Sequence, residues 1–152
     1  MVSPFPLPDP MRRALDLAYA AQQAGEVPIG AVVTLGGRII GEGENRNRRD
    51  KDPTAHAEMV AIREASRRIG DFRLTGCDLW VTLEPCPMCA GAISHARIAR
   101  LYYAVSDPKG GALEQGPRLF AQPQCLHRPE VYGGLAEAEA SALLRGFFAA
   151  RR

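Results

Sequence analysis

The chain contains 152 residues, of which 46% are hydrophobic and 24% are charged. These fractions argue against a disordered, collagen-like or coiled-coil protein and fit one compact folded domain. The formal net charge of +2 neither requires nor excludes a polyanionic partner. Of the 19 Lys and Arg residues, 17 are Arg, the side chain that pairs best with phosphate.

The sequence indicates a cytoplasmic protein with no membrane partner. No apolar run reaches the roughly 20 residues that span a bilayer, and the first ten residues lack the pattern of a secretory signal. Four cysteines are too few for a disulfide scaffold. In a reducing compartment, the close pair Cys86 and Cys89 points instead to metal or redox chemistry.

The amino-terminal region predicts a loose tail and then a helix. Residues 1–8 carry three prolines and no periodicity, so we expect a flexible tail ahead of a single domain over residues 9–152. Asp9 and Pro10 suit the N-cap and the first turn of a helix of about 15 residues. Gly25 is the expected stop.

A β-hairpin and a second helix are predicted next. The β-prone runs 29–35 and 38–43 flank Gly36-Gly37, a dipeptide typical of a two-residue hairpin turn. A polar, basic segment follows. Thr54 is then expected to cap a helix that ends near residue 69.

The second half of the chain alternates strand and helix patterns. The predicted elements are a strand at 78–83, a helix at 87–96, a strand at 100–105, a Gly-rich loop at 107–116, a short strand at 130–132 and a closing helix at 136–152. Such alternation predicts a three-layer α/β/α sandwich around a mixed sheet of about five strands, some of them parallel.

The strongest motif is His56-Ala57-Glu58 followed, after a strand, by Pro85-Cys86-Pro87-Met88-Cys89. The two cysteines, at i and i+3 at a helix start, can turn both sulfurs to one point, and the positive helix end favours their thiolate forms. With His56 they would give zinc three protein ligands and leave the fourth position to water. Glu58 could then hydrogen-bond that water without binding the metal.

This arrangement suits a hydrolytic deamination. Activated water attacks an electron-poor amidine carbon, and Glu58 carries the water's proton to the ring nitrogen and then to the departing amine. The combination of H-x-E with P-C-x-x-C is the known signature of zinc deaminases.

Longer strings around the motif resemble those of the bacterial tRNA-specific adenosine deaminases of the cytidine deaminase-like superfamily. The resemblance covers about residues 11–152. Its strings are Asn45 together with the DPTAHAE run ending at Glu58, VTLEPC at 81–86, MCAGA at 88–92, and Phe147-Phe148 with Arg151-Arg152. The fold that it implies is the cytidine deaminase-like α/β/α sandwich.

The resemblance also implies an activity and an assembly. The activity is conversion of adenosine to inosine at wobble position 34 of an arginine tRNA. The assembly is a homodimer that holds one Zn²⁺ per subunit and binds the tRNA anticodon stem-loop.

Site residues follow from the resemblance position by position. The zinc ligands are His56, Cys86 and Cys89, and the proton shuttle is Glu58. Asn45 and Ala57 match positions that line the base pocket, and Asp107 matches a loop position near the flipped anticodon nucleotides. The remaining candidates for substrate contact are Phe147, Phe148, Arg151 and Arg152.

On a helix the two phenylalanines point about 100° apart, so one can be buried while the other faces a partner. Residues 108–126 depart from the family pattern, which affects the anticodon contacts.

Three alternatives stay open at this level. A structural zinc site would need a fourth ligand, for which the candidates are His95, Cys125 and His127. A deaminase of free bases or nucleosides, of the guanine or cytosine type, would share the same ligands. A non-catalytic zinc-stabilised binding module would have no need of Glu58.

The basic segment after the hairpin has two interpretations. Its cations are Arg46, Arg48, Arg49 and Lys51. Because Asp50 and Asp52 lie among them, the segment could be a solvated loop. Because it lies beside the predicted zinc helix, the cations could instead contact RNA phosphates.

Overall fold

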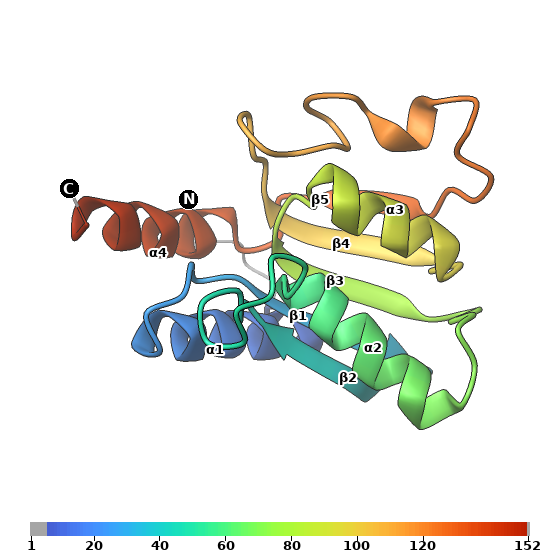
Figure 1. Ribbon diagram of the computed structural model, residues 1–152, viewed down its shortest axis with the longest axis horizontal. Helices are drawn as coiled ribbons and strands as arrows, with labels where there is room; N and C mark the ends of the chain where they lie inside the picture. Colours follow the sequence, from blue (N-terminus) through green and yellow to red (C-terminus); the bar gives the residue numbers. More distant parts are fainter. Residues whose placement is uncertain (1–5, 152) are drawn as a thin grey trace.

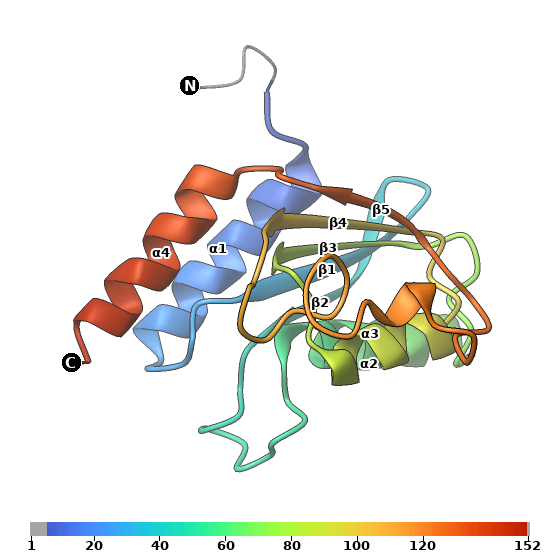
Figure 2. The same cartoon turned by 90° about the horizontal axis from the view of Figure 1, so that it is seen from above.

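The computed structural model describes residues 6–151, which form one mixed five-stranded sheet with helices on both faces (Figures 1 and 2). In chain order the elements are α1 (Asp9–Gln23), β1 (Gly30–Leu35), β2 (Arg38–Glu44), α2 (Ala57–Ile69), β3 (Asp78–Leu83), α3 (Pro87–His95), β4 (Arg100–Val105), the 3₁₀ turn η1 (Leu119–Ala121), β5 (Glu130–Gly133) and α4 (Glu137–Ala149). The predicted three-layer sandwich is confirmed. Residues 1–5 of the expected tail lie outside the described residues.

The sheet has the strand order β2-β1-β3-β4-β5. β1 pairs antiparallel with β2 and β3, whereas β3, β4 and β5 are mutually parallel. Gly36 and Gly37 have φ of 58° and 80°, the left-handed values that the predicted hairpin turn requires. β2 and β3 therefore run in the same direction and end at the same edge of the sheet. α2 follows β2 and α3 follows β3, so both helices begin at that edge (Figure 1).

The two faces of the sheet carry separate apolar cores. α1 and α4 cover one face, where Met11, Leu15 and Leu143 pack on strand residues Val32 and Trp80. α2 and α3 cover the other face (Figure 2), whose core includes Ala31, Ala61, Leu79, Ile93 and Leu101. Neighbouring residues of β1, β3 and β4 thus point to opposite cores, which explains why these three strands are apolar at most positions.

Helix α2 lies unusually close to β2 because the strand presents glycine to it. A Cβ atom at Gly43 would lie 2.3 Å from the Ala57 carbonyl oxygen, and one at Gly41 would lie 2.3 Å from the Ala61 carbonyl oxygen. The helix contributes small alanines to the same contact. This packing determines where α2 begins.

The structure corrects several predicted boundaries. Pro8, and not Asp9, is the N-cap of α1, and Asp9 lies in the first turn. Thr54 does not cap α2, because its backbone N–H and its hydroxyl both donate to Asp52 Oδ1, at 2.8 and 2.7 Å. His56 is the N-cap instead. α4 ends at Ala149, ahead of the predicted end.

Within residues 6–151, no helix combines the length and the apolar character needed to cross a bilayer.

Candidate active site

The three predicted metal ligands meet at the sheet edge where α2 and α3 begin. The ligand atoms of His56, Cys86 and Cys89 all lie within 4.8 Å of one another. His56 Nδ1 is 3.5 Å from the Sγ atom of each cysteine. Zinc bonds of about 2.3 Å to sulfur and about 2.0–2.1 Å to nitrogen, at tetrahedral angles, separate the two atoms by about 3.5 Å. The donor set and its spacing therefore fit a zinc ion.

Helix starts position all three ligands. His56 is the N-cap of α2, Cys86 is the N-cap of α3, and Cys89 is the third residue of α3. Both helices therefore direct their positive ends at the cluster, which favours negatively charged sulfur. The Cys89 thiol and the His56 ring hydrogen-bond to Cys86 and lower its pKa to about 4. The same bond, together with burial, raises the pKa of Cys89.

The three rival fourth ligands, His95, Cys125 and His127, lie outside the cluster. Among residues 6–151, the cluster of possible metal ligands contains only His56, Cys86 and Cys89. Cys125 Sγ lies 3.5 Å from Ser94 Oγ and donates to the His127 carbonyl oxygen at 3.1 Å. The His127 ring lies 2.6 Å from the Ile98 carbonyl oxygen. The described residues thus leave one zinc position for a non-protein ligand, as catalytic zinc sites do.

Glu58 is a buried carboxyl group two residues beyond His56. It is the second residue of α2 and its exposed fraction is 5%. Burial raises its pKa to about 7, although its own backbone N–H and the charge of His56 partly oppose the rise. A carboxyl group with this pKa can both accept and release a proton near neutral pH.

The structure brings Asn45 and Ala57 to the same place. Asn45 follows β2 directly and is buried, and its Oδ1 accepts a hydrogen bond of 2.9 Å from the Ala57 N–H. Ala57 is fully buried between the metal ligand His56 and Glu58. Within residues 6–151 the Asn45 Nδ2 group has no hydrogen-bond acceptor, so it is available to a bound ligand.

Asp107 is tied to the site through Glu84, a residue that the sequence analysis missed. The Glu84 carboxylate is 2% exposed. Its Oε1 accepts hydrogen bonds from Ser106 Oγ and the Asp107 N–H at 2.8 and 3.0 Å. Its Oε2 accepts three more from the backbone of residues 113–115. Because Glu84 lies two residues before Cys86, it joins the 107–116 loop to the metal site. A carboxylate between a strand and Pro-Cys was the signal available in the sequence.

The α4 candidates lie on the other face of the sheet. Phe147 is buried, and the Arg151 guanidinium lies 3.5 Å from its ring centre. Phe148 is 48% exposed. α4 extends past the edge of the sheet at which α2 and α3 begin (Figure 1). Arg152 lies outside the described residues, and the structure gives it no position.

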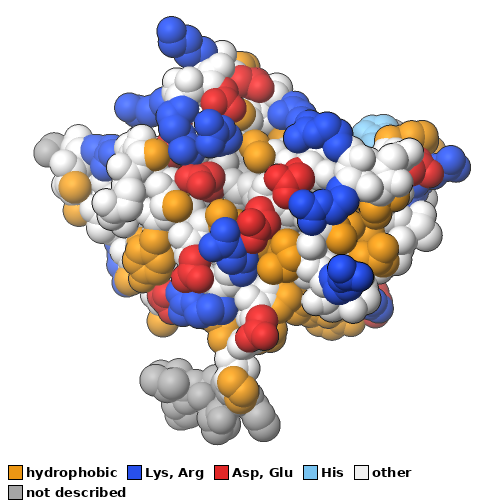
Figure 3. All heavy atoms as spheres, turned by 90° about the horizontal axis from the view of Figure 1, so that it is seen from below, with side chains coloured by type: hydrophobic (Ala, Val, Ile, Leu, Met, Phe, Trp, Pro, Cys, Tyr) orange, Lys and Arg blue, Asp and Glu red, His pale blue; other side chains and the backbone are white. Residues whose placement is uncertain are grey.

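The basic segment between β2 and α2 is partly neutralised. Arg46 pairs with Asp50 at 3.0 Å, and Arg49 pairs with Glu26 and Glu44 at 3.2 and 3.1 Å. Figure 3 shows Lys and Arg side chains gathered at this end of the molecule with acidic side chains between them. Two of the four cations thus have acidic partners, and contact of the segment with RNA phosphates stays a prediction.

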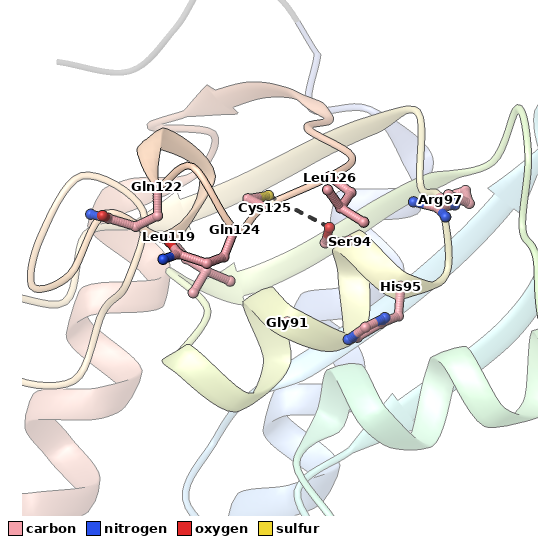
Figure 4. Close-up of a pocket in the computed structure, with 9 residues that line it drawn as sticks. All are labelled: Gly91, Ser94, His95, Arg97, Leu119, Gln122, Gln124, Cys125 and Leu126. Atoms are coloured by element: carbon pink, nitrogen blue, oxygen red, sulfur yellow. Dashed lines mark hydrogen bonds between the residues drawn. The ribbon is translucent and has the colours of Figure 1, made fainter.

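A separate pocket of about 290 Å³ lies at the other end of α3 (Figure 4). Ser94 and His95 line it from the helix, and Leu119, Cys125 and Leu126 line it from the facing segment. Leu126 is 84% exposed. None of the three metal ligands lines this pocket.

Comparison with known proteins identifies deaminases both by family model and by sequence similarity. The family model of the cytidine and deoxycytidylate deaminase zinc-binding region matches residues 8–105. A tRNA-specific adenosine deaminase of Agrobacterium fabrum is 56% identical over 142 residues, which is 93% of each chain.

Solved structures match as well. One, from studies of A-to-I editing by tRNA:A34 deaminases at the wobble position of transfer RNA, has a TM-score of 0.88 at 56% identity, covering 89% of this chain and 98% of that chain. A guanine deaminase of Bacillus subtilis has a TM-score of 0.62 at 45% identity, covering 64% of this chain and 62% of that chain.

The fold and the zinc site together define a hydrolytic deaminase, and the chain belongs to the cytidine and deoxycytidylate deaminase family. Within that family it groups with the tRNA-specific adenosine deaminases.

Proposed function

We propose that the protein converts adenosine to inosine at wobble position 34 of an arginine tRNA. The observation that carries the proposal is the buried Glu58 beside the cluster of His56, Cys86 and Cys89. The similarity to tRNA-specific adenosine deaminases supports the choice of substrate.

Proton transfer in this reaction is the task of Glu58. When bound at the three ligands, zinc supplies a Lewis acid that lowers the pKa of the attacking water. Glu58 accepts the water's proton and donates it to ring nitrogen N1 as the oxygen bonds to C6. Glu58 then takes the proton of the new C6 hydroxyl group and passes it to the amino group, the C6–N6 bond breaks as the C6 carbonyl forms, and ammonia leaves. A pKa of about 7 suits a group that must both take and give the proton.

Base recognition falls to residues around the ligands. The Ala57 N–H donates a hydrogen bond to Asn45 Oδ1. The Asn45 Nδ2 group can therefore donate a hydrogen bond to an acceptor atom of the adenine ring. Ala57 adds no bulk beside the ring. Asp107 contacts the flipped anticodon nucleotides from the loop that Glu84 holds in place.

Contacts to the rest of the anticodon stem-loop come from the basic surface. Phe148 is exposed and available for stacking on a nucleotide. Arg48, Lys51, Arg151 and Arg152 supply salt-sensitive phosphate contacts. The Arg151 guanidinium group makes a cation–π contact with the Phe147 ring, which helps to hold Arg151 in place.

The proposal includes a homodimer in the cytoplasm. The apolar pocket beside α3 and the exposed Leu126 form the surface that we assign to the second copy. The four free cysteines suit a reducing compartment.

The substrate is tested by incubating purified zinc-loaded protein with four candidates: an arginine tRNA anticodon stem-loop, free adenosine, guanine and cytidine. We expect inosine from the stem-loop alone. A matched stem-loop with the adenosine moved to position 35 should stay unmodified. Ammonia release only from guanine or another free compound would instead establish the small-molecule alternative.

A further inference from the structure

Glu26 is a buried carboxylate that the reaction does not use. It lies in the turn after α1 and is 2% exposed. Its oxygens accept the backbone N–H groups of Arg48 and Arg49 at 3.2 and 2.9 Å, and Arg49 Nε at 3.2 Å. A buried carboxylate is costly unless it is paired and hydrogen-bonded. Glu26 therefore holds the middle of the basic segment against the body of the domain.

The Arg49 guanidinium continues this network toward the active site. Its Nη2 group donates to Glu44 Oε2 at 3.1 Å and to the main-chain oxygen of Asn45 at 2.6 Å. One planar group thus joins the α1–β1 turn, the end of β2 and the Asn45 backbone. A rigid fork of donors can make these bonds together, whereas the single ammonium of a lysine lacks that geometry.

Asn45 is consequently held on three sides. Arg49 binds its carbonyl oxygen, its own N–H donates to the Ile29 carbonyl oxygen at 3.2 Å, and its side-chain Oδ1 accepts from Ala57. Of these three bonds, only the Arg49 bond comes from a charged side chain, and Arg49 lies in the segment between β2 and α2. Loss of it would free the Asn45 backbone to move relative to the start of α2.

We propose that Arg49 is a positioning residue that acts through Asn45 and is not a phosphate contact. This inference rests on the proposed function only in that Asn45 binds the base. Arg48 provides a matched comparison, because it precedes Arg49 in the same segment and its side chain makes no ion pair within the described residues.

The test is a pair of double-mutant cycles on the zinc-loaded enzyme. Arg49→Ala and Arg48→Ala are each made alone and with Asn45→Ala. Three quantities are measured: the single-turnover deamination rate at saturating stem-loop RNA, the RNA dissociation constant and the zinc content. We expect Arg49→Ala to lower the rate about tenfold with zinc retained, since small displacements of a positioning group reduce rates strongly.

The losses of deamination rate caused by Arg49→Ala and Asn45→Ala should not add, because each substitution removes the correctly placed Asn45 side-chain amide. Arg48→Ala should weaken RNA binding, and its effect should add to that of Asn45→Ala. If the Arg49 and Asn45 effects add fully, or if Arg49→Ala weakens binding without changing the rate, the proposal is overturned.

A conservative variant covers the case in which Arg49→Ala loses zinc or unfolds. Arg49→Lys keeps the positive charge but lacks the planar guanidinium group with its several donors. We expect it to lower the deamination rate as much as Arg49→Ala does, and we expect no further loss when it is combined with Asn45→Ala. A wild-type rate in Arg49→Lys would show that only the charge matters and would refute positioning. If the wild-type enzyme deaminates a free nucleoside and not the RNA, the substrate proposal fails, and the cycle is then run with that nucleoside.

Discussion

Three buried carboxyl groups illustrate how hydrogen bonding assigns roles to single residues. Glu26, Glu58 and Glu84 are each at most 5% exposed. Burial raises the pKa of all three, but backbone N–H groups donate to Glu26 and to Glu84 and bring the net pKa of each below its ordinary value. Glu58 has fewer such donors, so its pKa rises to about 7. Glu26 and Glu84 therefore remain charged anchors, and Glu58 is the group able to carry a proton.

Replacement of Glu58 should separate chemistry from metal binding. Glu58→Gln keeps the size of the side chain but cannot shuttle a proton, so we expect about 10²- to 10⁴-fold slower deamination with full zinc content. Rates come from single-turnover assays, and zinc content comes from elemental analysis. Cys86→Ser is the comparison, and it should lose zinc as well as activity. Undiminished turnover in Glu58→Gln would remove Glu58 from the mechanism.

At the scale of secondary-structure elements, the site depends on two helix starts at one sheet edge. In the chain, α2 follows β2 and α3 follows β3. The two strands run in the same direction. Close packing of α2 on Gly41 and Gly43 then determines the height of the helix above the sheet. The positions of His56 and Glu58 thus depend on glycines that never touch the metal.

A methyl group at Gly43 should displace α2. A Cβ there would lie 2.3 Å from the Ala57 carbonyl oxygen and 2.7 Å from the Ala61 nitrogen, both of which are backbone atoms that cannot rotate away. We expect Gly43→Ala to reduce the free energy of unfolding by about 1–3 kcal/mol, measured by urea titration. The zinc affinity should fall in parallel.

Gly146→Ala in α4 is the control, because nothing lies within 4 Å of a Cβ at that position. It should stabilise the protein by about 0.5–1 kcal/mol, the usual gain for alanine over glycine inside a helix. Equal stability of the Gly43→Ala and wild-type proteins would contradict the packing argument.

At the scale of the whole molecule, the sheet separates the catalytic face from a supporting face. α2 and α3 carry the zinc ligands on one face, and α1 and α4 fill the other (Figure 2). Arg12 and Glu139 join α1 to α4 with two hydrogen bonds, at 3.0 and 2.6 Å. The surface that we propose for a second copy is the outer side of α3, with the pocket that Ser94, His95 and Leu126 line.

The dimer assignment predicts a particle mass of twice the chain mass of 16.5 kDa. We expect this mass by light scattering, and we expect Leu126→Arg to shift the particle toward the monomer, because it places a charge on an apolar interface. Phe72→Arg serves as the control, since Phe72 is another exposed apolar residue but lies outside the pocket. A dimer that tolerates Leu126→Arg would place the interface elsewhere.

Local patterns were enough for much of the fold and for the chemistry of the site. Strands β3 and β4 and the Gly36-Gly37 hairpin were predicted from short-range signals. The boundary at Thr54 was not, because Asp52 competes for its hydroxyl. The ligand set could be predicted because zinc chemistry requires particular residue types at particular spacings.

By itself, the sequence determined the layered α/β architecture and the three residues whose cluster fits a zinc ion. Only the tertiary structure decided that Arg49 pairs with Glu26, that Glu84 anchors the loop of Asp107, and that Cys125 and His127 stay away from the zinc ligands. The reason is physical. Helix and strand patterns report interactions between near neighbours in the chain, whereas each of these contacts joins residues more than 20 positions apart or depends on competition among several partners.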